Sequence, residues 1–227
     1  MYSVPYIDVH THSAKKSVQT ITVQNIFPGD RFAAFSGRNF YSVGLHPWFL
    51  KSPEENNIQL NLVEEALEFD PVIFVGECGV DKTRPAFDEQ MRVFKAQVFM
   101  AEEFKKPLVI HCVKAYNEVL ELHDKLHPET DWILHGYSGG VEMTKQLEKR
   151  GLFFSFGAVL LKSGSKAIDS FRYLPVEKIF FETDEFEGNV KQIYSRGAKL
   201  KNVSLETMSK AVWANFNRIE NIAINSF

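Results

Sequence analysis

Short apolar runs recur along the chain, and segments with a helical period separate most of them. Each run spans three to six residues and is rich in Val, Ile, Phe and Tyr, which favours a strand over a helix. Most runs do not alternate polar with apolar residues, as expected of strands that are covered on both faces in a parallel sheet. The pattern therefore predicts eight strands, at Pro5–Val9, Val18–Val23, Phe40–Leu45, Val72–Val75, Leu108–Ile110, Trp132–Leu134, Leu152–Phe156 and Lys178–Phe181.

The segments between these runs show the spacing of amphipathic helices. Apolar residues recur every three or four positions over residues 87–101 and, in a shorter stripe, over residues 119–126. A further helix is predicted over residues 141–150, and Ser204 is a suitable N-cap for a last helix. Strands that alternate with helices in this way predict an α/β protein with a TIM-type (β/α)8 barrel.

The connection between the first two runs is too short for a complete barrel unit. Only about eight residues, 10–17, join the two runs, whereas a parallel crossover with its helix needs at least ~10–12 residues. We therefore expect the first helix to be missing and the barrel to be shortened and irregular around its first two strands.

Length and composition are typical of one globular domain, which we expect to span residues 1–227. A chain of this size buries about 70% of its surface on folding, which is enough for one large core. The net charge of −3 provides no general basic field, so a nucleic-acid substrate would have to be held by local groups. Two cysteines, no signal-peptide pattern and no apolar run of membrane-spanning length predict a cytoplasmic protein without membrane contact, and they do not indicate an oligomeric state.

Histidines and carboxylates gather where the apolar runs stop. His10 and His12 follow the first run and lie two residues apart, so both side chains project to the same side of a strand. The carboxyl ends of all barrel strands open onto one face, so residues from distant parts of the chain are expected to meet there in one pocket. Burying several imidazoles with carboxylates is costly unless a cation neutralises them, which predicts a metal site. The residues at these run ends are His10, His12, His46, Glu77, His111, His135 and Asp184.

Four other reactive side chains are expected to lie away from this site. His123 and His127 fall on or after a helical segment among charged residues, so we expect their side chains to be solvated. Cys78 and Cys112 each directly follow a proposed ligand, and the alternation of a strand turns them to the opposite side. We expect both to be small core residues and not metal ligands.

The ordered motifs of this chain resemble those of the TatD family of metal-dependent hydrolases. The resemblance implies a barrel related to the amidohydrolases, which binds one to three divalent metal ions and hydrolyses phosphodiesters, often as a deoxyribonuclease. The motifs that carry it are Asp8-Val9-His10-Thr11-His12, Gly44-Leu45-His46-Pro47, Gly76-Glu77-Cys78-Gly79-Val80-Asp81, Ile110-His111, His135-Gly136-Tyr137-Ser138-Gly139 and Glu182-Thr183-Asp184.

The resemblance also implies metal-binding roles for individual residues. His10 and His12 look like ligands of one metal ion, and His111 and His135 like ligands of a second. Glu77 resembles the carboxylate that bridges the two ions, which also makes it a catalytic residue. This set of nitrogen and oxygen ligands suits Zn²⁺, Mn²⁺ or Mg²⁺. Two such ions can activate a water molecule and neutralise the charge that develops on a phosphate.

Three further residues are implied in catalysis or substrate binding. Asp184 resembles a metal ligand that also accepts and returns the proton of the attacking water, and His46 occupies the place of a substrate-phosphate contact. The family often has an arginine where this chain has Val113, with Lys114 beside it. A lysine supplies a point charge for the substrate but not the bidentate fork of an arginine.

The leading hypothesis is a metal-dependent phosphodiesterase of the DNase or exonuclease type, acting on DNA ends or single strands through a metal-activated water. An alternative is an amidohydrolase that uses the same metal site on a small amide, ester or lactone, because the absence of a basic field suits a small substrate equally well. A third is a non-catalytic metal-binding or partner-binding protein, and the complete set of candidate ligands argues against it.

Overall fold

A computed structural model describes residues 4–13, 17, 19–30 and 39–220 of the chain. The chain divides into two compact units, one formed by residues 1–23 with residues 136–227 and the other by residues 24–135. We describe the two units separately, and the expectation of a single domain over residues 1–227 stays a prediction.

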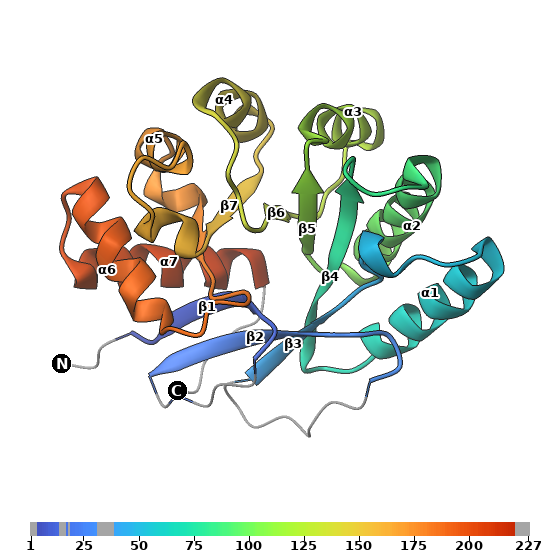
Figure 1. Ribbon diagram of the computed structural model, residues 1–227. Coiled ribbons are helices and arrows are strands. Elements are labelled where there is room, and N and C mark those ends of the chain that lie inside the picture. Colours follow the sequence, from blue (N-terminus) through green and yellow to red (C-terminus); the bar gives the residue numbers. More distant parts are fainter. Residues whose placement is uncertain (1–3, 14–16, 18, 31–38, 221–227) are drawn as a thin grey trace. The chain divides into compact units, whose positions relative to one another are not determined.

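All eight predicted strands are present, and they follow one another in the sheet in chain order (Figure 1). The pairs β3–β4, β4–β5, β5–β6 and β7–β8 are parallel. The first and last strands also contact each other, and a parallel bridge joins Thr11 to Asp184, which lies beyond the end of the last strand. This is the topology of a TIM-type barrel, as predicted. The strands are β1 (Tyr6–Thr11), β2 (Thr20–Ile26), β3 (Asn39–Val43), β4 (Val72–Asp81), β5 (Leu108–Val113), β6 (Trp132–Leu134), β7 (Phe153–Phe156) and β8 (Ile179–Phe181).

From β3 onward, at least one helix follows each strand. The predicted helices correspond to α2, α3, α4 and α7, and the Ser204 hydroxyl accepts a hydrogen bond from the Thr207 amide at 3.0 Å, as an N-cap does. None of the described helices combines the length and hydropathy that crossing a membrane requires. The α-helices are α1 (Pro53–Leu67), α2 (Phe87–Phe104), α3 (Tyr116–Leu126), α4 (Val141–Lys149), α5 (Ala167–Tyr173), α6 (Val190–Lys201) and α7 (Leu205–Glu220), and the short 3₁₀ helices are η1 (Pro47–Phe49), η2 (Ala158–Leu161) and η3 (Val176–Lys178).

The first crossover is shortened, as predicted. β1 ends at Thr11 and β2 begins at Thr20, and the described residues between them are bends, a turn and coil and not helix. A side chain from a late helix supports β1 instead: the Tyr194 hydroxyl on α6 accepts a hydrogen bond from the Ile7 amide and donates one to the Ile7 carbonyl, each at 3.0 Å. A buried phenol thus satisfies backbone groups of β1.

β4 is longer than the apolar run that predicted it. The run ends at Val75, but the strand continues to Asp81 with a shift in register between Val75 and Cys78, so Glu77 lies inside the strand and not at its end. Glycines allow this continuation because they admit close backbone contacts. A Cβ on Gly44 would lie 2.7 Å from the Gly76 Cα, and one on Gly79, whose φ is +132°, would lie 2.1 Å from the His111 carbonyl oxygen.

A buried glutamine fixes the chain where it leaves β3 in the unit of residues 24–135. Gln97 on α2 is fully buried. Its Oε1 accepts a hydrogen bond from the Leu45 amide at 2.7 Å, and its Nε2 donates to the Leu45 carbonyl at 3.1 Å. The Gln97 side chain thus makes the hydrogen bonds that a neighbouring strand would otherwise make to the backbone of Leu45. Leu45 is the residue directly before His46.

Replacing Gln97 with alanine is expected to lower the free energy of unfolding by about 2–5 kcal/mol, because it leaves the buried amide and carbonyl of Leu45 unpaired. Urea denaturation followed by circular dichroism measures this change. The matched control is Gln146→Ala on the exposed side of α4, which is expected to change the free energy by less than about 0.5 kcal/mol. Equal losses for both variants would contradict the role given to Gln97.

Candidate metal centre

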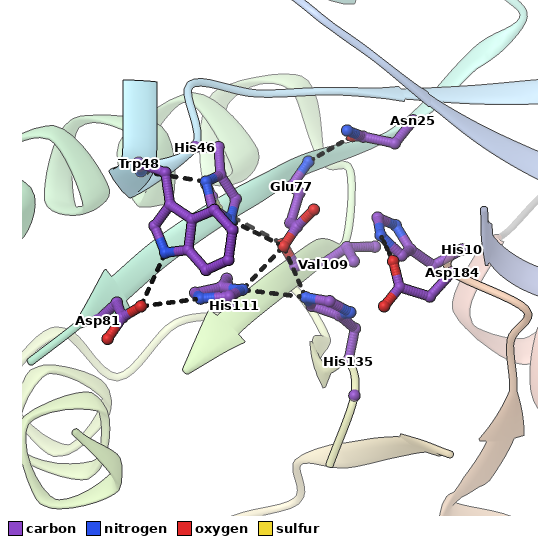
Figure 2. A network of polar contacts seen from close by, with 12 residues as sticks. His10, Asn25, His46, Trp48, Glu77, Asp81, Val109, His111, His135 and Asp184 are labelled. Carbon is purple, nitrogen blue, oxygen red and sulfur yellow. Dashed lines mark hydrogen bonds and ion pairs between the residues drawn. The ribbon is translucent and has the colours of Figure 1, made fainter. Parts of the chain in front are cut away.

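Glu77 is the central residue of a cluster in the unit of residues 24–135 (Figure 2). One of its carboxylate oxygens, Oε1, lies 3.0 Å from His46 Nε2, 2.9 Å from His111 Nδ1 and 2.7 Å from His135 Nε2. Glu77 is only 4% exposed. Imidazole nitrogens and a carboxylate oxygen at this spacing match the chemistry of a site for Zn²⁺ or a similar divalent ion.

These side chains converge because of their places in the sheet. Glu77 projects from β4 and His111 from the neighbouring strand β5, while His46 follows β3 and His135 directly follows β6. The Glu77 amide donates a hydrogen bond to Asn25 Oδ1 at 2.7 Å, and that oxygen also accepts one from a serine hydroxyl on β3. Asn25 thus fixes the Glu77 backbone against β2. The sequence did not indicate Asn25, because the predicted second strand ends at Val23 and only the observed β2 extends to Ile26.

The hydrogen bonds of His46 determine which of its nitrogens carries the proton. His46 Nδ1 accepts a hydrogen bond from the Trp48 amide at 3.1 Å, so in the neutral ring Nε2 is protonated and donates to Glu77. Burial is the largest influence on the pKa of His46 and lowers it below the usual value, and the attraction of Glu77 offsets this only in part. In this arrangement His46 is therefore oriented to donate a hydrogen bond to Glu77 through Nε2.

A second carboxylate, Asp81, stands behind His111. Asp81 Oδ2 lies 3.7 Å from His111 Nε2 and accepts a hydrogen bond from Trp48 Nε1 at 2.7 Å. Burial alone would raise the pKa of Asp81, but hydrogen bonds from Thr83 and Trp48 together outweigh it and hold the pKa below its usual value. A carboxylate behind a ligating imidazole orients the ring and increases its basicity. We had not assigned Asp81 a role, although its spacing of four from Glu77 places both on the same side of the strand.

A second cluster lies in the other unit, at the ends of β1 and β8. His12 Nε2 lies 3.4 Å and His10 Nε2 3.8 Å from Asp184 Oδ1, and the centres of the two imidazole rings are 5.1 Å apart. His10 is fully buried, whereas the side chains of His12 and Asp184 are each about one-third exposed. The cluster therefore combines two imidazoles with a carboxylate that solvent can reach.

A hydrogen-bond network beneath this second cluster fixes the residue before Asp184. Asp8 Oδ1 accepts from the Thr183 amide at 2.8 Å, and Asp8 Oδ2 accepts from the Thr183 hydroxyl at 2.7 Å. The backbone joins the two strand ends directly, because the Asp184 amide donates to the His10 carbonyl at 3.0 Å. The buried Asp8 is thus a supporting residue, and it holds β8 in register with β1.

The structure therefore sorts the predicted site residues into two clusters. His46, Glu77, His111 and His135 belong to the unit of residues 24–135, whereas His10, His12 and Asp184 belong to the other unit. Each cluster brings together residues that the sequence placed at separate run ends. That the two clusters form one centre, with Glu77 shared between two ions, stays a prediction.

The side chains predicted to lie away from the site are placed largely as expected. Cys78 is fully buried and Cys112 is partly buried, and burial raises the pKa of both thiols, that of Cys112 to about 12. His127 is exposed, as predicted. The prediction of a solvated His123 is wrong in part, because its ring packs edge-on against Trp132 with ring centres 5.0 Å apart. Lys114 is exposed and directly follows β5.

Comparison with known proteins identifies relatives along almost the whole chain. A family model described as TatD related DNase matches residues 9–221. An uncharacterized metal-dependent hydrolase of Methanocaldococcus jannaschii is 26% identical over 95% of this chain and 96% of the relative. A Salmonella typhimurium protein named 3'-5' ssDNA/RNA exonuclease TatD is 31% identical over 50% of this chain and 45% of its own length.

A solved structure shares the fold. The crystal structure of YJJV, a TatD homolog from Escherichia coli K12, matches with a TM-score of 0.80 and 21% identity, covering 96% of this chain and 98% of that chain. At this identity the likeness confirms the fold class and does not by itself identify a substrate.

Adding Zn²⁺ or Mn²⁺ to chelator-treated protein is expected to raise the melting temperature. An ion at one hundred times its dissociation constant adds about 2.7 kcal/mol, which corresponds to about 5–10 °C for a protein of this size. Glu77→Gln is expected to lose most of the rise, because the amide cannot supply a charged ligand among the three imidazoles. Differential scanning fluorimetry measures the shift. The control is His127→Asn, at an exposed position with a left-handed backbone, and it is expected to keep the full rise in melting temperature. An undiminished rise in Glu77→Gln would show that the ion binds elsewhere.

Proposed function

The chain belongs to the TatD related DNase family of metal-dependent hydrolases, and we propose that the bond it hydrolyses is a phosphodiester of a single-stranded nucleic acid. The observation that carries this proposal is a metal-type ligand set with a further imidazole, His46, whose Nε2 is directed into the same cluster. His111, His135 and Glu77 offer ligand atoms, while His46 directs an N–H into the same cluster. Such a donor suits the oxygens of a phosphate.

Metal ions would be held by residues of both clusters. His111, His135 and Glu77 would hold one divalent ion, and His10, His12 and Asp184 would hold another. Bound there, a divalent cation polarises the phosphate and lowers the pKa of a water molecule towards neutrality. The buried Asp81 lies 3.7 Å from His111 Nε2, and the buried Asp8 fixes the strand end that carries Asp184.

The remaining steps are carried by side chains of the chain itself. His46 donates a hydrogen bond from Nε2 to a non-bridging phosphate oxygen of the substrate. This bond replaces the one that His46 makes to Glu77 without substrate. Asp184 accepts a proton from the attacking water and returns it to the leaving oxygen, a role that its partial exposure beside two imidazoles supports. Lys114 contributes a positive charge to the phosphate backbone.

Asp184→Asn is expected to lower kcat on a single-stranded oligonucleotide about 100- to 10,000-fold, because the amide cannot accept the proton of water. The measurement is the release of nucleotides from labelled DNA and RNA strands with Mn²⁺ or Mg²⁺. Asp169→Asn, an exposed carboxylate on α5, is the matched control and is expected to behave like wild type. Intact strands with wild-type enzyme, together with cleavage of an amide, ester or lactone, would support the amidohydrolase alternative instead.

Lys114→Ala is expected to raise KM for a single strand with little change in kcat, because the lysine meets the substrate in the ground state and the transition state alike. Removal of one phosphate contact also lowers the slope of log binding constant against log salt concentration by about 0.7. Titrations at several salt concentrations measure both effects. Lys125→Ala, an exposed lysine on α3, is the control. An unchanged slope in Lys114→Ala would remove this residue from the substrate path.

A further inference from the structure

Three large aromatic side chains are exposed together beside the Glu77 cluster. Phe27 is 42%, Trp48 is 49% and Phe49 is 50% exposed. The rings of Phe27 and Phe49 meet edge to face with centres 5.1 Å apart. Other exposed apolar side chains of the unit, such as Phe99 on α2, lie outside this group, and single exposed residues of that kind are ordinary. Three exposed aromatic side chains that are linked by ring contacts, to one another or through His46, indicate a binding surface.

These aromatic rings contact candidate site residues directly. The ring centre of His46 lies 5.2 Å from that of Trp48 and 5.6 Å from that of Phe49, and Trp48 also lies 5.6 Å from His111. Figure 2 shows the indole of Trp48 beside both histidines. A ligand that covers the exposed aromatic surface therefore extends to the atoms that we propose hold the phosphate.

Trp48 is held in one orientation before any ligand arrives. Its backbone amide donates to His46 Nδ1, and its indole Nε1 donates to Asp81 Oδ2 at 2.7 Å. Both donors are satisfied within the protein, so the exposed part of the side chain offers only π surface. A ring fixed in this way loses little conformational entropy when a flat group stacks on it.

Positive charge accompanies the aromatic surface. The guanidinium of Arg84 lies 4.3 Å from the centre of the Trp48 ring, within cation–π distance. Lys82 is close in sequence, but it pairs with Glu118 on α3 and contributes less charge. We call Phe27, Trp48, Phe49 and Arg84 the aromatic platform. Exposed rings and a guanidinium together are the side chains on which unstacked nucleobases bind.

We infer that the aromatic platform stacks the bases of a single-stranded nucleic acid next to the phosphate held at the Glu77 cluster, an inference that rests on the proposed function. With a net charge of −3, the protein lacks a general attraction for nucleic acid, so local stacking supplies affinity that charge does not. Bases paired in a duplex are already stacked and cannot reach the rings. The platform therefore selects single strands or frayed ends, largely independently of base sequence.

The test compares two phosphorothioate-linked strands, which resist hydrolysis, on the metal-supplemented full chain. One is a fluorescein-labelled oligothymidylate, and the other has the same length with abasic residues in place of the nucleotides. Fluorescence anisotropy gives both dissociation constants. Wild type is expected to bind the base-bearing strand about 5- to 100-fold more tightly, the range for loss of one base–aromatic stack.

Variants of the aromatic platform show whether that preference arises there. Phe49→Ala is expected to reduce the ratio of the two dissociation constants towards one while leaving the affinity for the abasic strand unchanged. Arg84→Gln is a second variant at an exposed position, and it is expected to reduce the ratio in the same direction. Phe99→Ala is the matched control, since Phe99 is 52% exposed and has the cation of Lys95 at 5.5 Å, and it keeps the wild-type ratio.

Three results would overturn the inference. Wild type could bind both strands with equal affinity, or Phe49→Ala could weaken the binding of both strands equally. Phe99→Ala could also reduce the ratio of the two dissociation constants as much as Phe49→Ala does. A dimer in gel filtration that Phe49→Ala converts to a monomer would assign the surface to a second copy of the chain. The proposed function fails separately, if ordinary phosphodiester strands stay intact although the base preference is measured.

Discussion

The burial of the Glu77 carboxylate among three imidazoles is the constraint on which the unit of residues 24–135 depends. An anion withdrawn from water is stable only when fixed donors or a cation replace its hydration. The surrounding structure supplies such a donor, since the Trp48 amide orients His46 towards Glu77. Gln97 and the close approach at Gly44 keep β3 near enough to β4 for these contacts.

The second cluster is supported by the same principle. Asp8 is a buried carboxylate that is satisfied by the amide and hydroxyl of Thr183, so it holds β1 and β8 together and places Asp184 beside His10 and His12. In both units, a buried polar side chain that does not itself act on the substrate supports a proposed site residue: Asn25 binds the Glu77 amide, and Asp8 binds the residue before Asp184. Such supporting residues explain how side chains far apart in the sequence reach hydrogen-bond distances.

In the proposed function, local contacts on the exposed surface supply the affinity for substrate that the net charge of the protein does not. The proposed substrate is a polyanion, yet this chain carries a net charge of −3. Metal ions and the His46 donor would hold one phosphate, and exposed rings beside them would hold the bases. Affinity would then come from a few local contacts and not from a long-range field.

The sequence by itself determined the eight strands and the shortened first crossover, because both depend on local period and on the length between apolar runs. It determined the family because that depends on ordered motifs along the chain. It did not show that β4 continues to Asp81, because Gly76 and Glu77 interrupt the apolar pattern and only the neighbouring backbones show why a strand fits there. The tautomer of His46, the support from Asn25, the burial of His123 against Trp132 and the exposure of Trp48 were likewise decided by tertiary structure. Each of these results from contacts between side chains or strands that a local pattern does not contain.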